Sequence, residues 1–173
     1  MPNEKNNNPT TKTTLLALRP GRRELGIAVL EGPDLLFWGV ANFRAYQGEE
    51  LLQAVEGRLR ALIQTYQPQV LAAEKPTPTR LAASPALGAV MSRISAVAVR
   101  EHLRVCLYRP EVVRAGIGAT TVVTQAQVVA RIVARYPHLE RCRLRKGQGR
   151  EDYWRPMFTA VAVGLVGSEE VGP

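Results

Sequence analysis

The stretch that decides the fold is residues 15–43, LLALRPGRRELGIAVLEGPDLLFWGVANF, in this chain of 173 residues. It holds three apolar runs, at 15–18, 25–30 and 35–43, separated by Arg-Pro-Gly and by Glu-Gly-Pro-Asp. Aliphatic and aromatic runs of this length favour β-strands, and Pro and Gly between them favour tight turns. The stretch therefore predicts a three-stranded antiparallel meander.

After the meander, segments with helical spacing alternate with short apolar runs. The pattern predicts helices at about 49–66, 85–102, 122–136 and 156–166 and strands at 70–73 and 105–108. A meander followed by βα units predicts an α/β fold, with a mixed five-stranded sheet and helices on both faces. We expect one domain over 14–167, a disordered polar tail over 1–13 and a short C-terminal tail over 168–173.

The charged residues indicate a polyanionic partner. Lys and Arg total 23 against 15 Asp and Glu, which leaves a formal net charge of +8, and 19 of the 23 cations are Arg. A planar guanidinium binds phosphate through two hydrogen bonds and stacks on bases, so this composition favours a nucleic-acid partner. A GC-rich or heat-adapted genome also replaces Lys by Arg, and this explanation of the ratio stays open, but it does not account for the net charge.

The same composition argues against several classes of protein. The longest nearly apolar run, residues 157–166, is too short to cross a bilayer, and the polar N-terminus lacks the apolar segment of a secretory signal. Cys106 and Cys142 are far apart and form no Cys-x-x-Cys pair, which argues against a zinc knuckle or a disulfide scaffold. We therefore expect a reduced, cytoplasmic protein with no membrane partner.

Several short segments, taken in order, resemble the motifs of one known family. They are Arg19-Pro20-Gly21 with Gly26-Ile27-Ala28-Val29, Leu71-Ala72-Ala73-Glu74, Gly116-Ile117-Gly118 with Thr124-Gln125-Ala126-Gln127-Val128, and the closing segment Glu151–Leu165. The ordered set resembles RuvC-type Holliday-junction resolvases over roughly residues 14–167. The resemblance implies a ribonuclease H-like fold, branched or structured DNA as a partner, and a homodimer. It also implies that the helix at 85–102 lies on or near the dimer interface, although the small residues of this helix suit a core position equally.

The chain departs from that family where metal ligands are expected. Resolvases of this kind cleave phosphodiesters with two divalent ions, which need about four carboxylates. The aspartate expected before Pro-Gly is Arg19 here, whereas Glu74 keeps the second position. At ~4 Å and an effective dielectric near 20, a guanidinium repels each unit of positive charge by about 4 kcal/mol. We therefore expect Arg19 to pair with Glu74 or to contact a phosphate, although both residues also suit an ordinary strand end.

The last pair of family acids has two possible registers in this chain. One register puts Trp154 and Met157 at those positions, and the other puts Asp152 and Arg155 there, so at least one acid is lost. Glu74 and Asp152 are therefore the candidate catalytic residues, and no metal site is predicted. Asp152 also suits a helix start, where acids interact favourably with the helix dipole. Mg²⁺ is expected only if the chain is an active endonuclease.

Eight cations are candidates for contact with nucleic acid. They lie at the first strand end, in the first turn and in the basic segment 141–150: Arg19, Arg22, Arg23, Arg141, Arg143, Arg145, Lys146 and Arg150. A solvated loop is the alternative for this segment. Tyr153 and Trp154 beside it suit either stacking on an unpaired base or burial. Arg93, Arg100 and Arg104 form a further basic group, spaced to lie near one helix face.

Three functions are compatible with the sequence. The first, which we favour, is a RuvC-like protein that binds branched or single-stranded nucleic acid and has lost most or all nuclease activity. The second is an active metal-dependent endonuclease that uses Glu74, Asp152 and Glu151 with one metal. The third is a dimeric scaffold that binds a protein partner and no nucleic acid.

Overall fold

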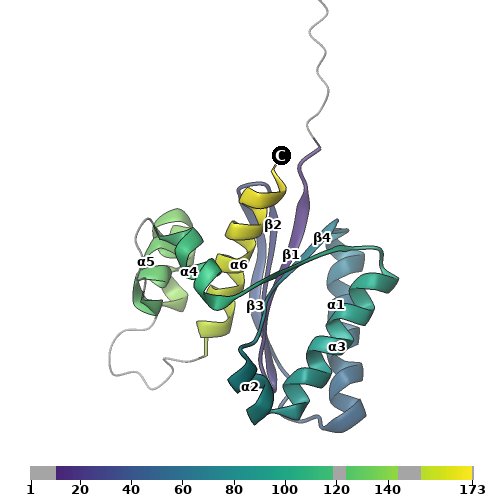
Figure 1. The fold of residues 1–173 in the computed structure, drawn as a ribbon. Helices are drawn as coiled ribbons and strands as arrows, with labels where there is room; N and C mark the ends of the chain where they lie inside the picture. The colour runs from purple at the N-terminus through teal and green to yellow at the C-terminus, as the bar shows by residue number, and fades with distance from the viewer. Residues whose placement is uncertain (1–10, 119–123, 144–152, 173) are drawn as a thin grey trace, which may run out of the picture.

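The computed structural model describes residues 11–118, 124–143 and 153–172, which fold around one five-stranded sheet (Figure 1). In the order β3-β2-β1-β4-β5, the strands are β3 (Asp34–Asn42), β2 (Glu24–Glu31), β1 (Thr14–Pro20), β4 (Val70–Glu74) and β5 (Arg104–Tyr108). The first three pair antiparallel, whereas β4 is parallel to β1 and β5 is parallel to β4. The predicted meander and mixed sheet are confirmed.

Helices cover both faces of this sheet (Figure 1). α1 (Gly48–Tyr66) and α3 (Pro85–Arg100) pack on one face, and the short α2 (Pro78–Ala83) connects β4 to α3. The other face carries α4 (Pro110–Ile117), α5 (Gln125–Arg135), the 3-10 helix η1 (Pro137–Cys142) and α6 (Arg155–Val171). Among the residues described, no helix has the length and apolar character needed to span a membrane.

The side chains of β1 alternate between two hydrophobic cores, one on each face of the sheet. Leu16 and Leu18 are fully buried in the core formed with α1 and α3. Leu15 and Ala17 are buried in the core on the α6 side. The same period of two places Arg19 on the α6 side, at the carboxyl end of the strand.

Gly26 of β2 allows the first turn of α6 to approach the sheet closely. A Cβ atom at this position would overlap the backbone carbonyl of Pro156, so a larger residue would displace the helix. Gly26 is paired with Arg19 of β1. The start of α6 is therefore held over the end of β1.

The sequence predictions miss three short helices, and they place two helix ends wrongly. α2, α4 and η1 each begin at a proline, a favoured first helical position, and no helix was predicted at any of the three. α6 continues to Val171, so residues 168–171, expected to be a tail, are helical. α5 begins at Gln125 because Thr124 caps it, with Gln127 completing a capping box. Residues 122–123 of the predicted helix and residues 1–10 of the predicted tail lie outside the described residues.

Candidate functional site

Arg19 and Glu74 lie side by side at the carboxyl ends of two parallel strands. Leu18 of β1 is in register with Ala73 of β4, so Arg19 and Glu74 are the next residues on their strands. Strand alternation puts both side chains on the face covered by α6. The expectation that these two strand ends converge is confirmed, and such ends are where open α/β sheets place ligand sites.

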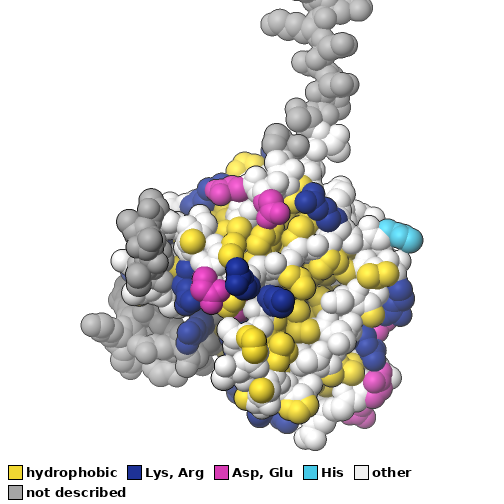
Figure 2. Space-filling view, in the orientation of Figure 1, with side chains coloured by type: hydrophobic (Ala, Val, Ile, Leu, Met, Phe, Trp, Pro, Cys, Tyr) yellow, Lys and Arg dark blue, Asp and Glu magenta, His cyan; other side chains and the backbone are white. Residues whose placement is uncertain are grey.

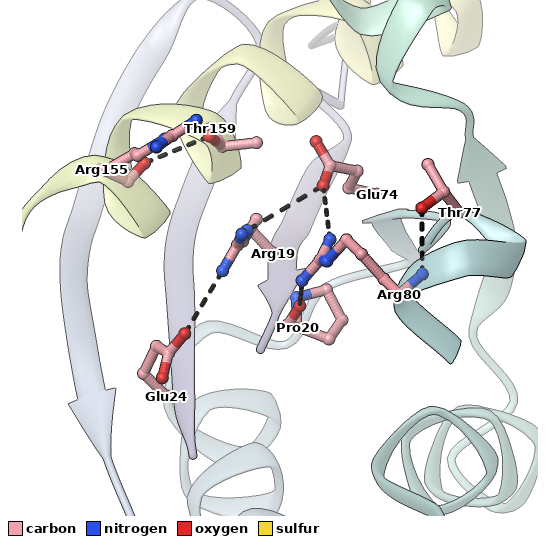
Figure 3. A network of polar contacts seen from close by, with 8 residues as sticks. All are labelled: Arg19, Pro20, Glu24, Glu74, Thr77, Arg80, Arg155 and Thr159. Carbon is pink, nitrogen blue, oxygen red and sulfur yellow. Dashed lines mark hydrogen bonds and ion pairs between the residues drawn. The ribbon is translucent and has the colours of Figure 1, made fainter. Parts of the chain in front are cut away.

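The Arg19 guanidinium lies between two carboxylates (Figure 3). Its Nη1 is 3.4 Å from Oε1 of Glu24, and its Nε is 3.9 Å from Oε1 of Glu74. The predicted pair with Glu74 is therefore present, but it is the longer of the two contacts. Glu24 enters the site from β2, where its side chain follows the same alternation as Gly26, and the sequence predictions did not include it.

Arg80 of α2 makes the shorter contact with Glu74, and sequence reasoning missed it (Figure 3). Its Nη1 is 3.3 Å from Oε1 of Glu74, and its Nη2 donates to the Pro20 carbonyl at 3.1 Å. The Thr77 hydroxyl accepts a hydrogen bond from the Arg80 backbone N–H and so caps the helix, which has Pro78 in its first turn. Thr-Pro is a recognised helix start. That signal was present in the sequence, but it was interpreted only as the end of β4.

Glu74 is a buried carboxylate in a strongly basic environment. The residue is 8% exposed, and Arg114 of α4 and Arg155 of α6 act on it electrostatically in addition to Arg19 and Arg80. Burial raises the pKa of Glu74 above its ordinary value, and the four guanidinium groups oppose that rise. The described site thus has more cations than acids, which favours an anionic ligand.

Burial also changes the titration of Arg19. It lowers the pKa of the Arg19 guanidinium, and the nearby charge of Arg80 lowers it further, whereas Glu74 and Glu24 raise it. An arginine remains protonated despite such a shift, because its ordinary pKa is far above neutrality. Arg19 is therefore a permanent cation at the end of β1.

The described residues around Glu74 do not fit a divalent cation. Mg²⁺ requires several oxygen ligands in a near-octahedral arrangement, whereas the Glu74 carboxylate faces two guanidinium groups. At ~4 Å from one guanidinium, a divalent ion would be repelled by about 8 kcal/mol at an effective dielectric near 20. Across residues 11–118, 124–143 and 153–172, no three His, Cys, Asp or Glu side chains are grouped so that they could hold a metal ion.

The closing helix contributes a cation rather than an acid to the described site. Met157 is fully buried in the core on the α6 side, and Trp154 packs partly buried against that core. Arg155 is exposed and acts electrostatically on Arg19 and Glu74. The register that aligns Asp152 and Arg155 with the family acids therefore puts a guanidinium beside the site.

The other predicted site residues fall into three groups. Arg22 and Arg23 lie in the turn after Pro20 and line a cavity at the same end of the sheet. The Arg141 guanidinium instead lies 5.7 Å from the centre of the Trp38 ring. Trp38 is on β3, and β2 and β1 lie between β3 and β4. Arg143 pairs with Glu140, so the structure does not bring Arg141 or Arg143 to Glu74. The remaining candidates lie outside the described residues: Arg145, Lys146, Arg150, Glu151 and Asp152.

Arg93 and Arg100 have a structural role, whereas Arg104, predicted to lie near the same helix face, is the first residue of β5. Arg93 Nη1 and Nη2 donate to Glu56 at 2.9 Å and to Glu49 at 2.7 Å, and Arg100 Nη2 donates to Glu56 at 2.9 Å. These bonds lower the pKa of Glu56 and raise that of Arg93. They join α3 to α1, so this basic group is neutralised within the fold.

Comparisons with known proteins identify the fold. No protein-family model matches the chain, and no curated protein sequence matches it. Thermus thermophilus RuvC in complex with a Holliday junction substrate aligns with a TM-score of 0.71 and 16% identity, over 92% of this chain and 94% of that chain. A second Thermus thermophilus RuvC structure aligns with a TM-score of 0.69 and 18% identity, over 89% of this chain and 92% of that chain. The yeast mitochondrial Holliday junction resolvase aligns with a TM-score of 0.64 and 10% identity, over 91% of this chain and 78% of that chain. The chain therefore has the RuvC-type, ribonuclease H-like fold that its sequence motifs indicated.

Proposed function

We propose that the chain binds branched or structured DNA through the phosphates and that its nuclease activity is lost or reduced. The RuvC fold supports a nucleic-acid-binding role, since a structure that it resembles holds a Holliday junction substrate. The net charge of +8 supports a polyanionic partner. The arginines around Glu74 supply hydrogen-bond donors suited to phosphate.

The observation that carries this proposal is the pair of guanidinium groups on Glu74. Arg19 comes from β1 and Arg80 from α2, so two separate elements place positive charge on the one buried acid at the strand ends. A guanidinium is a fixed cation that does not depend on metal concentration. Binding of DNA by this site therefore requires no divalent ion.

Binding is tested with a fluorescent four-way junction and a duplex of matched sequence, both in EDTA. We expect the junction to bind without a divalent ion. If four cations each neutralise one phosphate, the salt slope is about −3.6, and affinity falls about 100-fold between ~50 and ~200 mM salt. Arg22→Gln should reduce the slope by about 1, whereas Arg60→Gln on α1, which removes the same charge, should leave it unchanged. Affinity that does not depend on salt would contradict the proposal.

Cleavage is tested on the same junction with Mg²⁺ and with Mn²⁺. We expect no nicking by the wild-type chain, or only slow nicking. Efficient nicking that Glu74→Gln abolishes would establish the endonuclease alternative and contradict the proposal that nuclease activity is lost or reduced. Absence of a junction complex at low salt, in a chain that still dimerises, would favour the scaffold alternative.

We also propose that the chain acts as a homodimer that pairs through α3 and β5. β5 is an edge strand of the described sheet, and its Val105 and Leu107 are 37% and 45% exposed. Val99 of α3 is 69% exposed, and the exposed Ala89 and Ala96 precede it at helical spacing. Figure 2, which views the α3 side, shows hydrophobic side chains gathered in a band on this face. Exposed apolar edge strands are commonly covered, and small residues allow a second α3 to approach closely.

The oligomeric state is tested by analytical ultracentrifugation. The wild-type chain should sediment as a dimer, and the Val99→Glu, Leu107→Glu double variant as a folded monomer. Leu36→Glu is the matched control, because Leu36 is a 43% exposed apolar residue on β3, at the opposite edge of the described sheet. A monomeric wild-type chain at ~50 μM would contradict the dimer, since stable interfaces bind well below that concentration.

A further inference from the structure

A cavity of about 380 Å³ opens at the end of the sheet where β1 ends, between the β1–β2 turn and the starts of α1 and α3. Arg22 and Arg23 line it from the turn, Tyr46 and Gln47 from the segment before α1, and Ser84 from the α2–α3 junction. The described residues that line it include no acid. Its volume lies within the range of about 300–1,000 Å³ that is typical of small-molecule sites.

Backbone hydrogen bonds fix the Tyr46 segment next to the two arginines. The Phe43 N–H donates to the Arg23 carbonyl at 2.8 Å, and the Tyr46 N–H donates to the Phe43 carbonyl at 3.0 Å. Phe43 is buried, whereas Tyr46 is 43% exposed, and within the described part of the chain no other ring packs on Tyr46. An anchored segment thus presents an open aromatic face beside two guanidinium groups.

The cavity is connected to the Glu74 site through α2 and the β1–β2 turn. Arg80 contacts Glu74 with one guanidinium nitrogen and the Pro20 carbonyl with the other (Figure 3). Pro20 immediately precedes the turn that carries Arg22, and α2 leads directly to Ser84. The cavity therefore lies at the same end of the sheet as the Glu74 site, on the side of α1 and α3, whereas Arg19 and Glu74 lie on the α6 side.

We propose that this cavity binds one unpaired nucleotide of the DNA, with its base stacked on Tyr46 and its flanking phosphates on Arg22 and Arg23. Every base has a π-face, so stacking on an aromatic side chain needs no particular sequence, and Arg binds phosphate through its planar fork. An apolar ligand would leave the two arginines without a partner, and a duplex keeps its bases inside the stack. This inference rests on the proposed function and adds the structural feature of DNA that the chain distinguishes.

The test compares two DNA probes that differ by one nucleotide: a blunt duplex and the same duplex with one additional, unpaired 2-aminopurine. Tyr46→Leu should weaken binding of the bulged probe by roughly 5- to 150-fold, the range measured for loss of one base–aromatic stack. It should change binding of the blunt duplex by less than about twofold. Tyr46→Phe should restore wild-type affinity and the 2-aminopurine emission of the wild-type complex. Tyr66→Leu is the control, because Tyr66 is a partly exposed tyrosine at the end of α1 that does not line the cavity.

The outcomes separate this inference from the proposed function. If the wild-type chain binds both probes and Tyr46→Leu changes neither by more than about twofold, the cavity is not a nucleotide site and the DNA-binding proposal stands. If Tyr46→Leu weakens both probes equally, Tyr46 contacts the backbone and the base-stacking inference is wrong. If the wild-type chain binds the four-way junction but neither probe in ~50 mM salt, the cavity inference fails and the DNA-binding proposal stands, and if it binds none of the three DNAs, both proposals fail. Unfolding temperatures within about 2 °C of the wild type show that a variant is folded.

Discussion

Replacing Arg80 by Met tests the arrangement around Glu74 most directly. The substitution keeps much of the side-chain volume and removes two contacts, one to Glu74 at 3.3 Å and one to the Pro20 carbonyl at 3.1 Å. A hydrogen bond to a charged group contributes about 1.5–3 kcal/mol when it is shielded from water. The Arg80 side chain is 33% exposed and that of Glu74 10%, so we reduce each contact to about 1 kcal/mol. The expected loss of unfolding free energy is about 2 kcal/mol.

The assay is a double-mutant cycle with Glu74→Gln, measured by urea and thermal unfolding. For a chain of this length, about 2 kcal/mol lowers the unfolding temperature by roughly 4–8 °C. In the Glu74→Gln background, Arg80→Met should lower the free energy of unfolding by about 1 kcal/mol less than it does in the wild type, because only the hydrogen bond to the Pro20 carbonyl remains to be lost. Equal costs in both backgrounds, within ~0.3 kcal/mol, would refute the Arg80–Glu74 interaction. Arg44→Met, at an exposed arginine outside the site, controls for the loss of one surface charge.

Three further predictions concern helix packing, pH and metal. Gly26→Ala should lower the free energy of unfolding by about 1–3 kcal/mol, because the new Cβ would overlap the Pro156 carbonyl. Gly57→Ala is the control: nothing lies within 4 Å of its new Cβ, so it should stabilise α1 by up to about 1 kcal/mol. Equal unfolding temperatures for the two variants would contradict the close packing of α6 on the sheet. The pKa of Glu56 is lowered in the folded state, so the ionised carboxylate stabilises the fold above its ordinary pKa, and this stabilisation is lost as the pH falls through the folded pKa. Between pH 6 and pH 3, the unfolding temperature of Glu56→Gln should therefore fall less than that of the wild type. Addition of ~5 mM Mg²⁺ should leave the unfolding temperature within about 1 °C of that in EDTA, because a ligand that binds the folded state with useful affinity would raise it.

The sequence was sufficient to predict the features that follow from strand pattern. The turn motif at Arg19 and the run ending in Glu74 predicted two strand ends, and parallel pairing of β1 with β4 brought them together. Arg80 was missed because α2 has only six residues, too few to show helical periodicity. Glu24 was missed because its place depends on the register between β1 and β2, which fixes the face that each residue occupies.

The basic groups show the limit of reading charge from sequence. Arg93 and Arg22 have the same chemistry, yet one is neutralised by Glu49 and Glu56 across two helices and the other lines an open cavity. Long-range partners decide which cations stay available for a ligand, and they are separated along the chain by far more than one helical turn. Composition shows only that cations are in excess, whereas the fold shows which of the described cations lack an acidic partner.

The two guanidinium groups on Glu74 come from separate elements, so one substitution cannot remove both. An acid at position 19 would leave Arg80 against Glu74, and removing Arg80 would leave Arg19 in place. Either intermediate carries a broken ionic contact at a buried position, with no new ligand set to compensate for it. No single substitution at Arg19 or Arg80 therefore frees the Glu74 carboxylate from both guanidinium groups.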